Sequence, residues 1–135
     1  MIKTILWIWQ LPQHILALIL IKFYKGIKSK TLYKNSCLIK TNKEYNYKGA
    51  GAVSLGQYIL IDDNLSQIDS IVKHEYGHSI QSIIFGWFYL LFIGFFSYGN
   101  NFIWRKLWDN GKRSYYSLFP ERWADILGKT DNRKR

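Results

Sequence analysis

The chain has 135 residues, which fit one domain and exclude a multidomain protein, because chains usually divide only when one hydrophobic core can no longer grow. Hydrophobic residues make up 48% of it, which excludes an intrinsically disordered protein, and its single cysteine, Cys37, excludes an intramolecular disulfide framework or a multi-cysteine zinc site. Its 19 Lys and Arg residues against nine Asp and Glu residues give a formal charge of +10, which favours a partner carrying phosphate, either a nucleic acid or an anionic membrane surface.

Residues 4–23 form an apolar segment that suggests contact with a membrane. A spanning helix needs roughly 20 mostly apolar residues, and this segment reaches that length only by including four that lipid disfavours, namely Gln10, Pro12, Gln13 and His14. An interfacial or kinked helix is therefore an alternative to a spanning one. No small-residue cleavage site follows, so we expect the segment to be retained. We interpret His14 as a structural or interfacial residue.

A cluster of lysines follows this apolar segment directly, comprising Lys22, Lys25, Lys28, Lys30 and Lys34. Their position favours anionic lipid, and since no nucleic-acid-reading motif is visible we predict no nucleic-acid partner. Residues 1–30 are thus predicted to be the membrane-interacting segment of one domain covering 1–135. The lysines would hold the candidate site on the cytoplasmic side of a membrane, with a cytoplasmic protein as the alternative. Lysines that only solvate an aromatic-rich surface are a further alternative.

The middle of the chain predicts a small antiparallel sheet followed by a helix. Residues 36–48 carry weak strand signals, and the β-branched and aromatic stretch 53–61 predicts a better strand that pairs with them. Ser66 followed by Asp69 resembles a capping box, so we expect a helix from there to about Gly86.

The last third of the chain predicts two more helical regions. Residues 83–96 are almost continuously apolar but too few to span a membrane alone, so they fit a buried or a membrane-embedded helix. A polar stretch, 97–114, predicts a loop around a short helix at 102–108. Ser117 is expected to cap a final helix that has Pro120 in its first turn and ends at Gly128. Together these elements predict an α+β fold.

The sequence His74-Glu75-Tyr76-Gly77-His78 lies inside the helix predicted at 66–86. Positions i and i+4 share one helix face, so His74 and His78 can direct both imidazoles at one cation, and neutral imidazoles suit zinc. Glu75 lies outside that ligand pair but close to the metal, where a carboxylate can take a proton from a zinc-activated water. The alternative is two structural histidines on an ordinary helix.

Catalytic zinc usually takes three protein ligands and leaves a fourth position for water or substrate. Glu121 and Asp125 stand at i and i+4 on the final helix, where one can ligate while the other orients a histidine. A solvated helix edge is the alternative interpretation of this pair. Gly77 costs about 1 kcal/mol in a helix interior relative to Ala, which indicates that another backbone packs closely there or that substrate needs the space.

HEYGH followed by ERWAD resembles the gluzincin metallopeptidases, and the Ala124-Asp125 pair is most similar to the CAAX-prenyl-protease and HtpX-like membrane peptidases. The resemblance implies a zincin-like fold, a peptide or protein substrate, and one zinc ion. It implies His74, His78 and Glu121 as zinc ligands, Glu75 as general base and Asp125 behind a ligand histidine. It also implies an edge strand, here Tyr58 to Ile61, that lies above the zinc and holds an extended peptide by β-augmentation.

The chain departs from this family in having at most two apolar segments, so the match is to a minimal catalytic core. No residue of the sequence is marked as the oxyanion donor; Tyr115, Tyr116 and Arg122 are the candidates. A rival hypothesis is a non-enzymatic basic and aromatic membrane-binding protein with a structural or vestigial zinc site. A second rival is a nucleic-acid-binding protein that uses its basic and aromatic residues.

Overall fold

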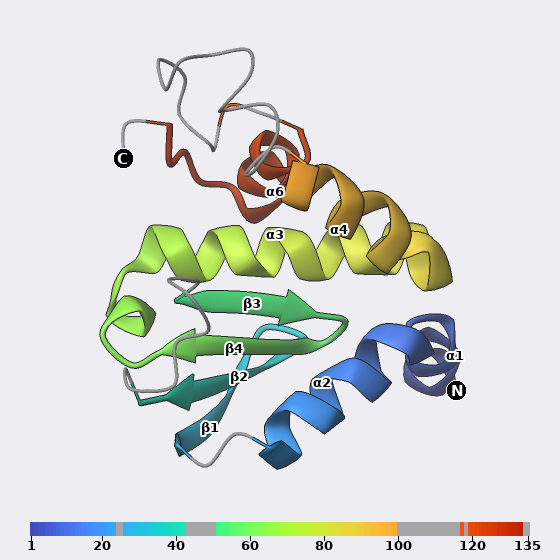
Figure 1. The fold of residues 1–135 in the computed structure, drawn as a ribbon, viewed down its shortest axis with the longest axis horizontal. Coiled ribbons are helices and arrows are strands. Elements are labelled where there is room, and N and C mark those ends of the chain that lie inside the picture. Colours follow the sequence, from blue (N-terminus) through green and yellow to red (C-terminus); the bar gives the residue numbers. More distant parts are fainter. Residues whose placement is uncertain (24–25, 43–50, 100–116, 118, 134–135) are drawn as a thin grey trace.

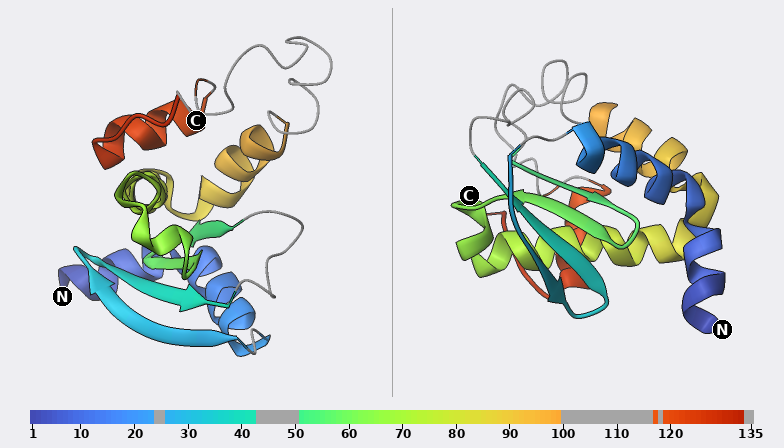
Figure 2. Two further views of the ribbon diagram at one scale, coloured as in Figure 1. Left: turned by 90° about the vertical axis from the view of Figure 1, so that its left-hand side faces the viewer. Right: turned by 90° about the horizontal axis from the view of Figure 1, so that it is seen from below.

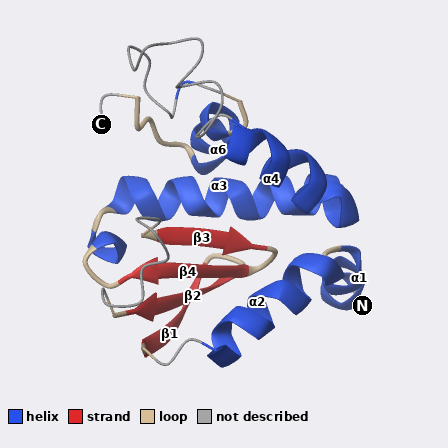
Figure 3. Ribbon diagram, viewed as in Figure 1, coloured by secondary structure: helices blue, strands red, loops and turns tan. Residues whose placement is uncertain are grey.

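The hydrophobic core lies between a four-stranded sheet and one long helix, α3 (Asp69–Phe85; Figure 1, Figure 3). The computed structural model describes residues 1–23, 26–42, 51–99, 117 and 119–133. Buried Leu38, Ile59 and Ile61 of the sheet pack against Val72 of the helix. A small sheet covered by helices confirms the predicted α+β class.

The sheet contains β1 (Ile27–Tyr33), β2 (Ser36–Thr41), β3 (Ala52–Leu55) and β4 (Tyr58–Asp62) in the order β1-β2-β4-β3. The pairs β1–β2 and β3–β4 are antiparallel hairpins, whereas β2 and β4 are parallel. The predicted pairing between the 36–48 segment and the next strand is therefore found. The prediction of a purely antiparallel sheet was wrong, because β4, the later strand of the second hairpin, lies inward and pairs with β2 in parallel.

The stretch 53–61, predicted as one strand, is a tight hairpin in the structure. Gly56 has φ 62°, a left-handed backbone conformation that favours glycine, and it turns the chain between β3 and β4. Consequently Tyr58–Ile61 belongs to an interior strand, and the prediction that it forms the edge strand was wrong. The edge next to α3 is β3, whose Ser54 hydroxyl lies 3.0 Å from the hydroxyl of Ser79 on the helix.

The predicted central helix is α3 (Asp69–Phe85), which follows the short 3-10 helix η2 (Leu65–Gln67). Its N-cap is Ile68 without a side-chain bond, so the capping box predicted at Ser66 was wrong; the Ser66 hydroxyl donates to the carbonyl of Asp63 instead. The end at Gly86 is confirmed, and this residue has φ 52°.

Beyond Gly86 the apolar stretch continues as η3 (Gly86–Phe88) and α4 (Tyr89–Gly99). The helix thus runs through Ser97 to Gly99, where the sequence predicted a loop, and the rest of that loop with its helix at 102–108 lies outside the described residues. The final helix, α6 (Glu121–Gly128), ends where predicted, but Pro120 is its N-cap and no side-chain cap is formed. Figure 1 shows α3 lying between the sheet and α6.

The N-terminal segment forms two helices, α1 (Ile2–Trp9) and α2 (Leu11–Phe23), bent by 79° at Gln10. A kinked helix was one of the two alternatives for this segment, and Pro12, which lacks a backbone N–H, lies directly after the bend. The continuous stretch Asp69–Phe96 passes a length and hydropathy test for a membrane span, and the bent pair passes it if counted as one span.

Candidate metal centre

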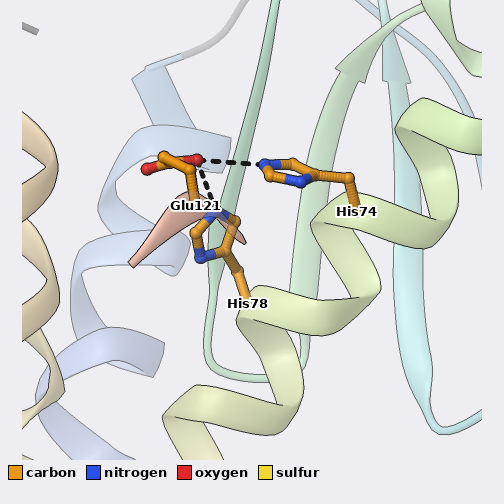
Figure 4. Close-up of side chains that lie close together, drawn as sticks. All are labelled: His74, His78 and Glu121. Carbon is orange, nitrogen blue, oxygen red and sulfur yellow. Dashed lines mark hydrogen bonds and ion pairs between the residues drawn. The ribbon is translucent and has the colours of Figure 1, made fainter. Parts of the chain in front are cut away.

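The site begins on the buried face of α3, where His74 and His78 stand one turn apart (Figure 4). Their rings are nearly perpendicular, with centroids 4.8 Å apart. The Nε2 atom of each ring lies 3.1 Å from the same oxygen, Oε2 of Glu121 on α6. All three side chains are buried, with at most 8% of each residue exposed. The structure therefore brings together the three residues predicted as ligands.

Glycines allow α6 to approach α3 closely enough for this arrangement. A Cβ atom added at Gly77 would lie 2.6 Å from the carbonyl carbon of Ala124, well inside ordinary van der Waals contact. A Cβ atom at Gly128 would lie 2.6 Å from the carbonyl carbon of Lys73. Each helix thus offers a glycine where the backbone of the other passes. Of the two reasons predicted for Gly77, close backbone packing is the one found.

Asp125 lies behind His74, on the side of the ring away from Glu121. Its Oδ1 is 2.7 Å from Nδ1 of His74 and also accepts a bond of 2.7 Å from the side-chain amide of Asn132. The backbone N–H of Asn132 donates to Oδ2 at 2.9 Å. Asp125 is fully buried, so these bonds fix its carboxylate and, through it, the orientation of the His74 ring.

Gln81 plays the corresponding part for His78. Its Nε2 donates to the carbonyl of Pro120 at 3.0 Å, which leaves Oε1 as the atom that lies 2.8 Å from Nδ1 of His78. The carbonyl can only accept, so Oε1 must accept as well and Nδ1 of His78 must carry the proton. Gln81 therefore orients a ring on α3 and also holds the N-cap residue of α6.

The hydrogen-bond pattern favours a cation between the three side chains. Acceptors at Asp125 and Gln81 place the protons of both histidines on Nδ1, so the Nε2 lone pair of each neutral ring faces Oε2 of Glu121. Three electron-rich atoms that converge in a buried space repel one another unless a cation or additional protons lie among them. These ligand atoms all lie within 4.8 Å of one another, so the group could hold a metal ion.

The distances suit a small tetrahedral ion. Metal–ligand distances of about 2.0–2.1 Å at tetrahedral angles separate neighbouring ligand atoms by roughly 3.3 Å. The two separations of 3.1 Å are close to this value. The ligand atoms of the two imidazoles lie within 4.8 Å of each other, so an ion would draw the two rings towards it.

Burial and neighbouring charge shift the protonation of the site in the absence of metal. Burial by itself lowers the pKa of His74, but the hydrogen bond to Glu121 and the charges of Glu75 and Glu121 outweigh it and raise the pKa to about 9. The pKa of His78 is raised by Glu121 in the same way against the effect of burial. Burial raises the pKa of the Glu75 carboxyl, although the two histidines oppose this shift. Burial therefore favours the protonated form of the Glu75 carboxyl.

Tyr89, which sequence reasoning did not single out, is a buried phenol near the same carboxylates. Burial and the charges of Glu75 and Glu121 raise the pKa of its hydroxyl, so it stays protonated. Of the predicted oxyanion candidates, Tyr115 and Tyr116 lie outside the described residues. The guanidinium of Arg122 lies 3.6 Å from the carboxylate of Asp131 in the C-terminal segment. No contact described for it reaches the histidines.

Two residues that support the site, Gln81 and Asn132, were missed in the sequence. Both are amides, which belong to no ligand motif and act here through their place in the fold. The position of Gln81, three residues after His78 on one helix, is a signal that could have found it, because residues at i and i+3 are neighbours. Asn132 had no comparable signal, since it meets Asp125 through the chain that follows α6.

Comparisons with known proteins give no further guide, because no family model, no curated protein and no solved structure matches this chain.

Proposed function

We propose that the protein is a zinc-dependent metallopeptidase of the gluzincin type, with a zincin-like fold. The observation that carries this proposal is the convergence of two imidazole Nε2 atoms and one carboxylate oxygen in a buried cluster, with the buried carboxyl of Glu75 close enough to interact electrostatically with all three residues. Two histidines and one glutamate are a typical ligand set of catalytic zinc, which keeps its fourth position open.

Zinc is favoured over other ions by the chemistry of this ligand set. Magnesium and calcium prefer six or more oxygen ligands, whereas this cluster offers two nitrogen atoms and one oxygen atom. Asp125 and Gln81 supply the outer hydrogen bonds that ligand histidines of zinc usually make.

The residues of the chain can carry out hydrolysis of a peptide bond around such an ion. When bound, zinc would act as a Lewis acid that makes a water molecule more acidic and polarises the scissile carbonyl. Glu75 would take the proton from that water and then deliver it to the leaving amine, a role that suits a carboxyl whose pKa is raised by burial. Asp125 and Gln81 would keep both rings oriented during the reaction.

The sheet offers a place for an extended substrate. Among the described residues β3 pairs with β4 on one side only, and its Ser54 contacts Ser79, the residue after His78. A peptide that added to the outer side of β3 would run beside the histidine pair by β-augmentation. We assign this part to β3 in place of Tyr58–Ile61.

Metal analysis of protein purified without added metal tests the proposal, followed by hydrolysis of a mixed peptide pool read by mass spectrometry. We expect one zinc ion per chain, loss of that ion in His74→Ala, and hydrolysis that depends on Glu75. Absence of bound metal refutes the proposal. A hydroxamate added to the cobalt-substituted protein tests whether the fourth coordination position is open, because its binding there would change the spectrum of the cobalt. If zinc is bound, no peptide is hydrolysed and this spectrum does not change, the rival hypothesis of a structural or vestigial site is favoured.

A further inference from the structure

A second feature of the molecule, separate from the metal centre, is an apolar surface at the end of α3 where Phe85 lies. There α1, η3 and α4 come together (Figure 1, Figure 2), and we call their outer surface the apolar end. Hydrophobic side chains on it are more than half exposed, among them Ile2, Ile5, Trp87, Phe88, Leu91 and Phe95. Soluble proteins rarely expose so many large apolar side chains together, and such surfaces typically mark a site of interaction.

Hydrogen bonds hold the apolar end in a fixed shape. The indole N–H of Trp9 donates to the carbonyl of Ile83, and that of Trp87 donates to the carbonyl of Ile8, each at 2.9 Å. The Ser82 hydroxyl donates to the buried side-chain carbonyl of Gln10 at the bend between α1 and α2. These bonds join the N-terminal helices to the end of α3, so the exposed side chains are presented by a preformed surface.

The charges around the apolar end suit a lipid surface with anionic headgroups. Residues 1–23 and 79–99 contain no Asp or Glu, and their only charged side chains are Lys3 and Lys22. Lys3 lies on α1, at the apolar end itself, whereas Lys22 ends α2 and Lys28 and Lys30 lie on β1, beyond the far end of α2 (Figure 1); Lys28 pairs with Asp63 at 2.9 Å. Exposed apolar side chains, partly exposed tryptophans and a basic residue, with no carboxylate on these helices, are a combination that membrane interfaces select.

The lengths of the helices favour a position in the interface over a span. With 8, 13 and 11 residues, α1, α2 and α4 are about 12, 20 and 16 Å long, shorter than the hydrocarbon core of about 30 Å. The longer stretch Asp69–Phe96 includes α3, which packs between the sheet and α6 and carries the buried histidines. That half of the stretch cannot also face lipid.

We propose that the apolar end inserts into one leaflet of a bilayer that contains anionic lipid, and that the rest of the domain stays outside the hydrocarbon. This proposal does not depend on peptidase activity. His78 lies seven residues before Phe85 on α3, which is about 10 Å along the helix axis. If the apolar end is inserted, the metal centre would therefore lie near the headgroups.

Vesicle flotation of the full chain tests the proposal, with phosphatidylcholine vesicles that either contain or lack 30% phosphatidylglycerol as a rough working fraction. We expect binding that is stronger on the anionic vesicles. The double variant Leu91→Asp/Phe95→Asp should lower the partition coefficient by about 100-fold, roughly tenfold for each apolar side chain lost. The matched control is Leu32→Asp/Ile126→Asp, which changes charge equally at exposed apolar positions on β1 and α6 and should stay within about threefold of wild type.

Several outcomes overturn the proposal: no binding by the wild type, equal binding to neutral vesicles, or equal losses in both double variants. A dimer in light scattering that Leu91→Asp/Phe95→Asp disperses, without vesicle binding, would assign the surface to a second copy. Quenching of wild-type tryptophan fluorescence by brominated lipid needs no variant, and its absence refutes insertion even if the variants misfold. Zinc content measured without lipid reports separately on the metal centre.

Discussion

Replacing Gly77 by alanine should disable the metal centre without changing any ligand. The new Cβ would lie 2.6 Å from the carbonyl carbon of Ala124 and 2.9 Å from its Cα, whereas ordinary contact begins at 3.4 Å. The two helices must therefore separate by about 0.8 Å or more, while metal–ligand distances tolerate only about 0.2 Å. We expect zinc affinity to fall at least about 100-fold, because Glu121 moves away with α6.

Stability should fall in the same variant. Alanine gains about 1 kcal/mol over glycine in a helix interior, but overpacking of this kind typically costs about 1–3 kcal/mol. The matched control is Gly94→Ala on α4, where a Cβ atom meets nothing within 4 Å, so the propensity gain should appear alone and zinc affinity should be unchanged. Chelator competition and thermal unfolding measure both quantities. A Gly77→Ala protein that binds zinc as tightly as wild type would refute the close crossing of α3 and α6.

Four further results are expected from the site. Glu75→Gln should keep its zinc while peptide hydrolysis falls by about 10²- to 10⁴-fold, and undiminished turnover would discard Glu75 as the base. His78→Ala should lose stoichiometric zinc by metal analysis, so full occupancy would point to another site. Gln81→Leu should weaken zinc binding by about 10- to 100-fold in chelator competition, because Nδ1 of His78 loses its acceptor. Gln81→Glu should recover part of the affinity, because it restores an acceptor. If the wild type and both variants bind zinc equally tightly, the role of Gln81 is contradicted. In metal-free protein the pKa of His74 is raised from 6.5 to about 9, so protonated His74 stabilises the fold below pH 6.5 and this stabilisation is lost as the pH rises to about 9. Urea unfolding at pH 6 and pH 9 should show a lower free energy of unfolding at pH 9. A higher free energy of unfolding at pH 9 would contradict this reasoning.

The residues that the structure brings together at the candidate site could largely be predicted from the sequence, because each pair of them is local in the chain. His74 and His78 share a face of any helix, and Glu121 and Asp125 share a face of another, so their spacing already fixes which atoms can converge. The sequence did not determine how closely the helices approach. That distance depends on Gly77 and on the small residues of α6, which act only once the two helices meet.

The sheet was less predictable because its pairing is not local. Gly56 allows a hairpin turn, but an isolated glycine in a β-branched run is also compatible with a bulge in one strand, so the run 53–61 was interpreted as a single strand. The parallel pairing of β2 with β4 depends on which strand of that hairpin turns inward. The sequence did not predict β1 as a separate strand, because five of its seven residues are exposed and it therefore lacks the alternation of apolar and polar residues that is typical of a half-buried strand.

The polar residues at the bend between α1 and α2 have a consequence for membrane topology. His14 accepts a bond from the backbone of Gln57 and donates one to Trp7, and the amide of Gln13 donates to the carbonyl of Gly86. These side chains are also the ones that interrupt the apolar run at 4–23. Leucines at Gln10, Gln13 and His14 would remove these bonds to the rest of the domain and create an almost unbroken hydrophobic stretch of spanning length, so we expect this variant to thread through a bilayer.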